Sequence, residues 1–148
     1  MFIVDIFIHC MYILIEGKTM KNKQRKFAVK LYLRRIEEDP NYSENQFAAE
    51  VQQYMNENFS SNPLYNAYDP FSLWADIANL WKALNMTPAE IVQYSGLKMS
   101  EFAARYVIPY RTLQAWCDGT NPCPIYIRIM LCELLGILRQ TERKQGEK

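Results

Sequence analysis

The sequence has few of the residues that mark catalytic sites. Its 148 residues include only one histidine, His9, and only five glycines. It contains no glycine-rich phosphate loop, no nucleophile-elbow motif and no pair of acidic residues in a catalytic setting. A single histidine near the N-terminus nearly excludes acid–base catalysis by imidazole. We therefore expect neither an enzymatic activity nor a bound cofactor.

Cysteine is also scarce, and its spacing does not match a metal site. The four cysteines are Cys10, Cys117, Cys123 and Cys132, and none of them forms a CxxC pair. Zinc sites need ligands at short repeated spacings, so we expect no bound metal. We interpret the cysteines as reduced thiols, mostly packed as small apolar groups, in a cytosolic protein.

The chain lacks a strong excess of either charge. Seventeen basic and sixteen acidic residues give a formal net charge of +1, so nucleic-acid binding would depend on local basic patches. Hydrophobic residues make up 49% of the chain and aromatic residues 14%, which is enough to build a globular core. The apolar N-terminal stretch "MFIVDIFIHCMYILIEG" is too short to span a membrane and is interrupted by Asp5. We expect a cytoplasmic protein without a membrane partner.

Residues 1–19 have two interpretations. They are either an N-terminal extension that forms a short β-strand, or the result of a mis-annotated start. In the second case translation begins at Met20, which is followed by "KNKQRK". The codons for Glu16, Gly17 and Lys18 are purine-rich and would resemble a ribosome-binding site.

The rest of the chain indicates an all-α fold, a small helical bundle. Residues 20–86 form a helical N-terminal region, in which a helix over 24–38 is favoured despite a partly alternating apolar pattern. Ser43 and Gln46 predict a capping box, as do Thr87 and Glu90. Residues 139–148 are predicted to be a flexible tail.

Residues 99–119 have the layout of a helix-turn-helix motif. A first helix is predicted over 99–106, a turn at Val107 and Ile108, and a second helix over about Pro109–Cys117 that ends before Gly119. The residues expected to face inward are Phe102 and Ala103 on the first helix, and Thr112 or Leu113 together with Trp116 on the second. In such motifs the second helix enters the major groove of DNA.

Residues 87–138 resemble the Cro and lambda-repressor-like helix-turn-helix domains, also called XRE-type. The features that carry the resemblance are Gly96-Leu97, Glu101-Phe102-Ala103, Ile108, Thr112-Leu113, Trp116 and Gly119. The chain departs from the family pattern at Lys98 and Met99, at Val107 in place of a turn glycine, and at Cys117 in place of an acidic residue. The resemblance implies a DNA-binding transcriptional regulator of bacterial, phage or mobile-element type.

If double-stranded DNA is the partner, the candidate contacts lie mainly on the second helix. Arg111 suits guanine and Gln114 suits adenine. Tyr110 would touch a phosphate or a thymine methyl group, Thr112 would reach a phosphate, and Ala115 lies toward solvent. The family's usual phosphate-binding residues at the start of the first helix are absent, and Lys98 and Ser100 could replace them.

A protein-binding function is the alternative. Small bacterial and phage proteins of this family also act as antitoxins or as inhibitors of host defence enzymes. The charges over residues 87–138 cancel, which predicts weak DNA binding by this module alone.

Two segments could strengthen DNA binding by this module, one through its own charge and one by joining two copies. The basic residues between Lys18 and Arg35 either track a nucleic-acid backbone or form a solvated helix face. The segment 125–138 is apolar nearly all round, as in a buried or homodimer-forming helix.

The aromatic-rich segment 59–81 could contact a protein partner.

Overall fold

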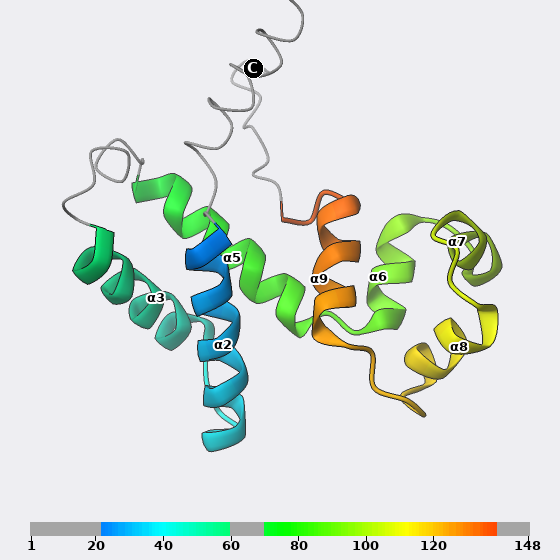
Figure 1. The fold of residues 1–148 in the computed structure, drawn as a ribbon, viewed down its shortest axis with the longest axis horizontal. Helices are drawn as coiled ribbons and strands as arrows, with labels where there is room; N and C mark the ends of the chain where they lie inside the picture. The colour runs from blue at the N-terminus through cyan, green and yellow to red at the C-terminus, as the bar shows by residue number, and fades with distance from the viewer. Residues whose placement is uncertain (1–21, 60–69, 139–148) are drawn as a thin grey trace, which may run out of the picture. The chain divides into compact units, whose positions relative to one another are not determined.

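The computed structural model describes residues 22–59 and 70–138, whose regular secondary structure is entirely helical. They form seven helices and no strand, which confirms the predicted all-α class for this part of the chain. The helices are α2 (Asn22–Glu38), α3 (Glu44–Phe59), α5 (Pro70–Asn85), α6 (Pro88–Ser95), α7 (Met99–Arg105), α8 (Tyr110–Asp118) and α9 (Ile125–Leu134) (Figure 1). The expectations for residues 1–19 and 139–148 lie outside the described residues. Within the described ranges, no helix is both long and apolar enough to cross a membrane.

The described residues belong to two compact units. The first comprises 22–59 and 70–78, and the second comprises 79–138, so the boundary falls within α5. We describe each unit by itself below.

In the first unit, α2 packs against α3 through aromatic and charged side chains. The rings of Phe27 and Tyr54 stack with centroids 3.5 Å apart. The carboxylate of Glu50 accepts hydrogen bonds from Arg35 Nε (3.1 Å) and from the hydroxyl of Tyr42 (3.2 Å). Burial and the adjacent Glu50 carboxylate raise the pKa of Tyr42, so this hydroxyl remains a donor at neutral pH.

The buried positions of α2 explain why a helix forms where the apolar pattern was ambiguous. The buried residues of this helix are Gln24, Ala28, Leu31 and Tyr32. They recur at intervals of three or four residues, whereas Leu33 and Ile36, apolar residues on another face of the helix, are exposed. The helical stripe therefore faces the core, and the alternation was incidental.

Both predicted capping boxes are confirmed. The backbone N–H of Gln46 donates to Ser43 Oγ (3.3 Å), and the N–H of Ser43 donates to Gln46 Oε1 (2.9 Å). Thr87 and Glu90 make the same reciprocal pair, at 3.2 and 2.8 Å, and Pro88 begins α6. Each box satisfies two backbone N–H groups that the helix leaves unpaired, which fixes where the helix begins.

The second unit encloses a core to which α6, α7, α8 and α9 all contribute. Its fully buried side chains include Leu80, Leu84, Ile91, Phe102, Leu113 and Cys132. Burial raises the pKa of Cys132 to about 11, so its thiol stays neutral and packs as an apolar group, as expected.

Arg128 of α9 fastens this core to the C-terminal end of α5. Its Nη1 donates to the backbone carbonyls of Leu84 and Met86, both at 3.1 Å. The carbonyls at a helix C-terminus carry partial negative charge and lack intrahelical donors, so a guanidinium suits both needs. Arg128 thus holds α9 against the connection between α5 and α6.

We predict that Arg128→Met lowers the free energy of unfolding by about 2 kcal/mol, because two charge-assisted hydrogen bonds to half-buried carbonyls are lost. Urea unfolding followed by far-ultraviolet circular dichroism would measure the change. Arg105→Met is the matched control, since Arg105 is exposed and, within residues 22–59 and 70–138, the only polar or ring interaction of its side chain is with the ring of Tyr106, whose centre lies 6.0 Å from Cζ. Equal stability of Arg128→Met and wild type would show that the tie is dispensable.

Candidate nucleic-acid interface

The turn between α7 and α8 sets the direction in which α8 leaves α7 (Figure 1). The N–H of Ile108 donates to the carbonyl of Ala103 (2.9 Å), and the N–H of Val107 donates to that of Ala104 (3.4 Å). This pair of bonds is the Schellman arrangement, which requires a left-handed residue just after the helix. Val107 takes that conformation, with φ +54°. It is a valine where glycine is usual.

The same chain uses glycine for the equivalent task elsewhere. Gly136 has φ +78° after α9, and the N–H of Ile137 there donates to the carbonyl of Cys132 (2.9 Å). A β-branched residue in this conformation is strained, because its side chain approaches the backbone carbonyl. Val107 is 88% exposed, so no burial of its side chain compensates for the strain. The predicted turn position was correct, and the valine tolerates it at a cost.

The second helix of this pair begins one residue later than predicted. Pro109 occupies the N-cap position, with extended backbone angles of φ −54° and ψ 129°, and α8 runs from Tyr110 to Asp118. Pro109 was expected to open the helix, but its ψ keeps it outside. Gly119 ends α8 with φ +74°, as the sequence predicted.

Leu113 anchors the inner face of α8 in the core. Leu113 is only 1% exposed, while Trp116 and Thr112 are half-buried. Phe102 and Ala103 of α7 are buried as expected. Leu113 is therefore the main anchor, and Trp116 covers the edge of the core.

The outer face of α8 presents polar side chains to solvent. Tyr110, Arg111 and Gln114 are all exposed, as predicted. No hydrogen bond or ion pair engages the side chain of Arg111 or Gln114 within the described part of the chain. Since residues three apart are neighbours on a helix, these two side chains lie side by side. Ala115 is half-buried, so it is less open to solvent than expected, and Thr112 is similarly placed.

The predicted phosphate-binding residues lie at the start of α7. Lys98 is its N-cap residue, with an exposed side chain, and Ser100 is exposed in the first turn. The N–H of Lys98 donates to the carboxylate of Glu101 (3.3 Å), so Glu101 supplies the cap that the lysine side chain cannot. The structure thus leaves Lys98 and Ser100 open to solvent at one helix end.

The N-terminus of α8 has no such cap. The first intrahelical hydrogen bond runs from the N–H of Leu113 to the carbonyl of Pro109 (3.1 Å), and Pro109 has no side-chain acceptor. The backbone N–H groups of Tyr110, Arg111 and Thr112 therefore have no partner within the helix. They add partial positive charge at the end of α8 where the exposed tyrosine and arginine lie.

The charge of this surface is mixed rather than strongly basic. Asp118 is exposed and follows Arg111 by two helical turns, so both lie on the outer face of α8. Lys82 lies 5.5 Å from the centre of the Tyr94 ring, and Arg128 is engaged by backbone carbonyls. The arrangement can contact a few specific groups, but it supplies little general attraction for phosphate.

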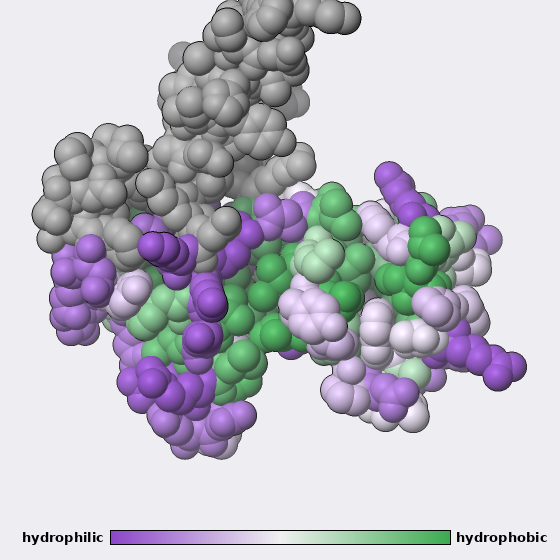
Figure 2. All heavy atoms as spheres, viewed as in Figure 1, coloured by the Kyte–Doolittle hydropathy of each residue, from purple (hydrophilic) through white to green (hydrophobic). Residues whose placement is uncertain are grey.

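A second exposed surface lies on α9. The sequence left this segment as either buried or homodimer-forming and did not indicate which of its side chains are exposed. Tyr126, Met130 and Leu134 are 63%, 57% and 62% exposed. Their spacing of four residues places them in one stripe, which we call the α9 apolar stripe. Figure 2 shows apolar and weakly polar atoms over the face of α9 that is turned to the viewer. Because the segment is apolar nearly all round, its pattern could not show which side stays exposed. The helix also ends at Leu134, four residues before the predicted end.

We predict that Val107→Gly raises the free energy of unfolding by about 1 kcal/mol, because glycine adopts a left-handed conformation without strain. Gly96→Ala is the matched comparison and should lower it by a similar amount. Gly96 has φ +72°, and an added Cβ there meets nothing within 4 Å, so backbone strain alone would account for the loss. Both changes would be measured as shifts in the denaturant midpoint of unfolding. The slope of the unfolding free energy against denaturant concentration should stay unchanged. A destabilised Val107→Gly protein would contradict the prediction.

Comparisons with family models, with curated proteins and with solved structures found no match to this chain.

Proposed function

We propose that the chain is a sequence-specific DNA-binding transcriptional regulator of bacterial, phage or mobile-element type. In this proposal α7 and α8 form a Cro- and lambda-repressor-like helix-turn-helix, and α8 lies in the major groove. The observation that carries it is the adjacent, exposed pair of Arg111 and Gln114. Both side chains lack partners in the described residues, on a helix fixed by the buried Leu113.

The chemistry of the pair suits base edges. Arginine donates two parallel hydrogen bonds to guanine O6 and N7, and the glutamine amide donates to adenine N7 and accepts from adenine N6. Three residues of helix advance about 4.5 Å, which is comparable with the 3.4 Å rise between base pairs. Arg111 and Gln114 are therefore spaced to contact neighbouring base pairs.

Phosphate contacts would orient the helix. The uncapped N–H groups at the start of α8 and the hydroxyl of Tyr110 suit one phosphate. Lys98 and Ser100 suit another, at the start of α7. The thymine methyl group is the alternative contact for Tyr110, and Thr112 lies close enough to the first turn to assist.

The α9 apolar stripe supports a second candidate function, binding to protein. Three large apolar side chains that are each more than half exposed form a surface suited to an apolar partner. A second copy of the chain is the simplest such partner, and a homodimer would double the DNA contacts. A partner enzyme is the other, as in an antitoxin or an inhibitor of a defence enzyme. Steep salt dependence of binding indicates DNA, whereas shallow dependence indicates an apolar protein interface.

We predict that Arg111→Ala weakens binding to the preferred duplex by about 1–3 kcal/mol and relaxes the preference at one base pair. The preferred duplex would first be selected from a library of random-sequence duplexes with the wild-type full chain. Fluorescence anisotropy would then compare it with duplexes changed at single positions.

Arg105→Ala serves as the control for this test, because Arg105 is an exposed arginine of the same unit that lies on α7. It should select the same motif as wild type. Selection of no motif, or an unchanged preference in Arg111→Ala, would contradict the proposed function.

We predict that Met130→Glu, which places a charge in the middle of the α9 apolar stripe, halves the number of chains bound per selected duplex. Sedimentation velocity with labelled duplex would measure the stoichiometry. Gln93→Glu adds the same charge at an exposed position of α6 and should leave it unchanged. One wild-type chain per duplex would show that the stripe does not join two copies.

A further inference from the structure

One face of α2 carries an unbroken row of basic side chains. Its members are Lys23, Lys26, Lys30 and Arg34, which we call the α2 basic stripe, and all four are exposed. They are spaced by three, four and four residues, so they follow one face of the helix. The buried residues Ala28 and Tyr32 lie on the opposite face. The row is therefore a surface feature that packing inside the unit does not require.

Two of the acidic residues on α2 and α3 pair with Arg35, which is not a member of the stripe. Glu38 and Glu50 both bind Arg35, at 3.0 and 3.1 Å. Among the described residues, no carboxylate pairs with any member of the α2 basic stripe. Glu37 is exposed three residues after Arg34, on the same face of the helix, and forms no ion pair with it. The three lysines lie before this acidic residue and present their charges to solvent unpaired.

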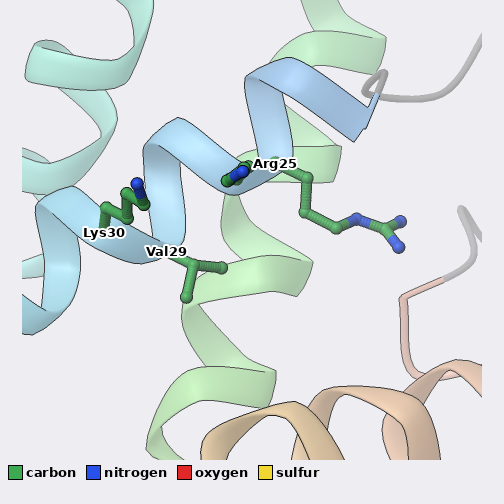
Figure 3. Close-up of a pocket in the computed structure, with 4 residues that line it drawn as sticks. Arg25, Val29 and Lys30 are labelled. Carbon is green, nitrogen blue, oxygen red and sulfur yellow. The ribbon is translucent and has the colours of Figure 1, made fainter.

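The surface beside this stripe is open rather than enclosed. A hollow of about 370 Å³ is lined by Arg25, Lys26, Val29 and Lys30. Figure 3 shows Arg25 and Lys30 extending to opposite sides of α2, with Val29 between them. Because these cations diverge, one small anion could not contact both. An extended partner with regularly repeated negative charges fits the arrangement better.

The second unit needs charge that it does not supply itself. Across residues 79–138, the basic residues are Lys82, Lys98, Arg105, Arg111 and Arg128, and the acidic residues are Glu90, Glu101, Asp118 and Glu133. Five positive and four negative charges leave a net charge of +1. On α2, six basic and two acidic residues leave +4. The described part of the first unit has six basic and seven acidic residues, a net charge of −1, so its positive charge is local to α2. Among the described helices, α2 alone carries a net positive charge, which makes it the strongest candidate for phosphate attraction.

We propose that the α2 basic stripe binds the phosphate backbone of duplex DNA. This inference rests on the proposed DNA-binding function and extends it from α8 to a helix of the other unit. Steps of three or four residues correspond to about 5 Å along the helix axis, and the whole stripe spans about 16 Å. At an axial rise of 3.4 Å per base pair, that length corresponds to about five base pairs of duplex, which is enough to reach several phosphates of one strand. The contact supplies affinity without base preference.

The test replaces Lys23, Lys26 and Lys30 together by glutamine in the full chain. Glutamine has a helix propensity close to that of lysine, so the helix should persist, which circular dichroism would check. The triple Lys→Arg variant at the same positions is the matched control, because it retains the charge. Anisotropy titrations from 50 to 300 mM salt would use the duplex selected by the wild-type chain and a scrambled duplex of equal length.

The glutamine variant should bind both duplexes more weakly by the same factor, so the ratio of the two affinities stays constant. The slope of log K against log salt should fall in magnitude by about 1 for each lysine that contacts a phosphate, and so by up to about 3. The arginine variant should retain the wild-type slope.

The outcomes separate this inference from the proposed function. An unchanged slope in the glutamine variant, with base preference still lost in Arg111→Ala, would overturn only the role of α2. A lowered slope with no base preference in the wild-type chain would support the α2 contact and overturn sequence-specific recognition by α8. Absence of duplex binding, or stripe-dependent binding to single-stranded RNA or anionic vesicles instead, would overturn the inference, since its partner is duplex DNA.

Discussion

The left-handed backbone of Val107 is the constraint on which the candidate recognition surface depends. If that residue were helical, the Schellman turn would be lost and α8 would leave α7 in a different direction, turning its outer face with it. The two Schellman hydrogen bonds and the burial of Phe102 and Leu113 hold the turn against the strain of a β-branched residue. The direction of Arg111 and Gln114 therefore depends on tertiary packing, which overrides the local preference of valine.

DNA binding by this chain would divide two tasks between two units. Base recognition requires few groups, but each must be held in place, and α8 meets this need because it is anchored in a core that Arg128 fastens to the end of α5. Phosphate attraction requires charge more than position, and the long lysine side chains of α2 suit it. If the two tasks are separated in this way, the exposed face of α8 can stay nearly neutral. A neutral surface is less prone to hold the wrong sequence through charge alone.

The sequence predicted best those features that depend on local chemistry. Helix starts are marked by Ser43 and Thr87, because their side-chain oxygens accept hydrogen bonds from nearby backbone N–H groups. A helix end is marked by Gly119, because a residue without a side chain adopts the left-handed conformation easily. The exposure of Arg111 and Gln114 followed from helical periodicity around the buried Leu113. The tie between Arg128 and the carbonyls of Leu84 and Met86 was not predictable, because it joins residues more than forty positions apart. The exposed side of α9 could not be predicted for another reason. A helix that is apolar nearly all round has no periodic pattern to distinguish its buried face from its exposed face.

The size of the α9 apolar stripe limits what it can do alone. Specific protein interfaces that are stable in solution bury roughly 1,200–2,000 Å² in total. Three side chains along two helical turns can supply only part of such an area, even when two copies meet. Two chains already held on one duplex would meet at a high effective concentration, and the same small contact would then suffice. If the stripe joins two copies, its size favours a homodimer that forms on DNA rather than before binding, so that phosphate attraction through α2 would promote assembly as well as affinity.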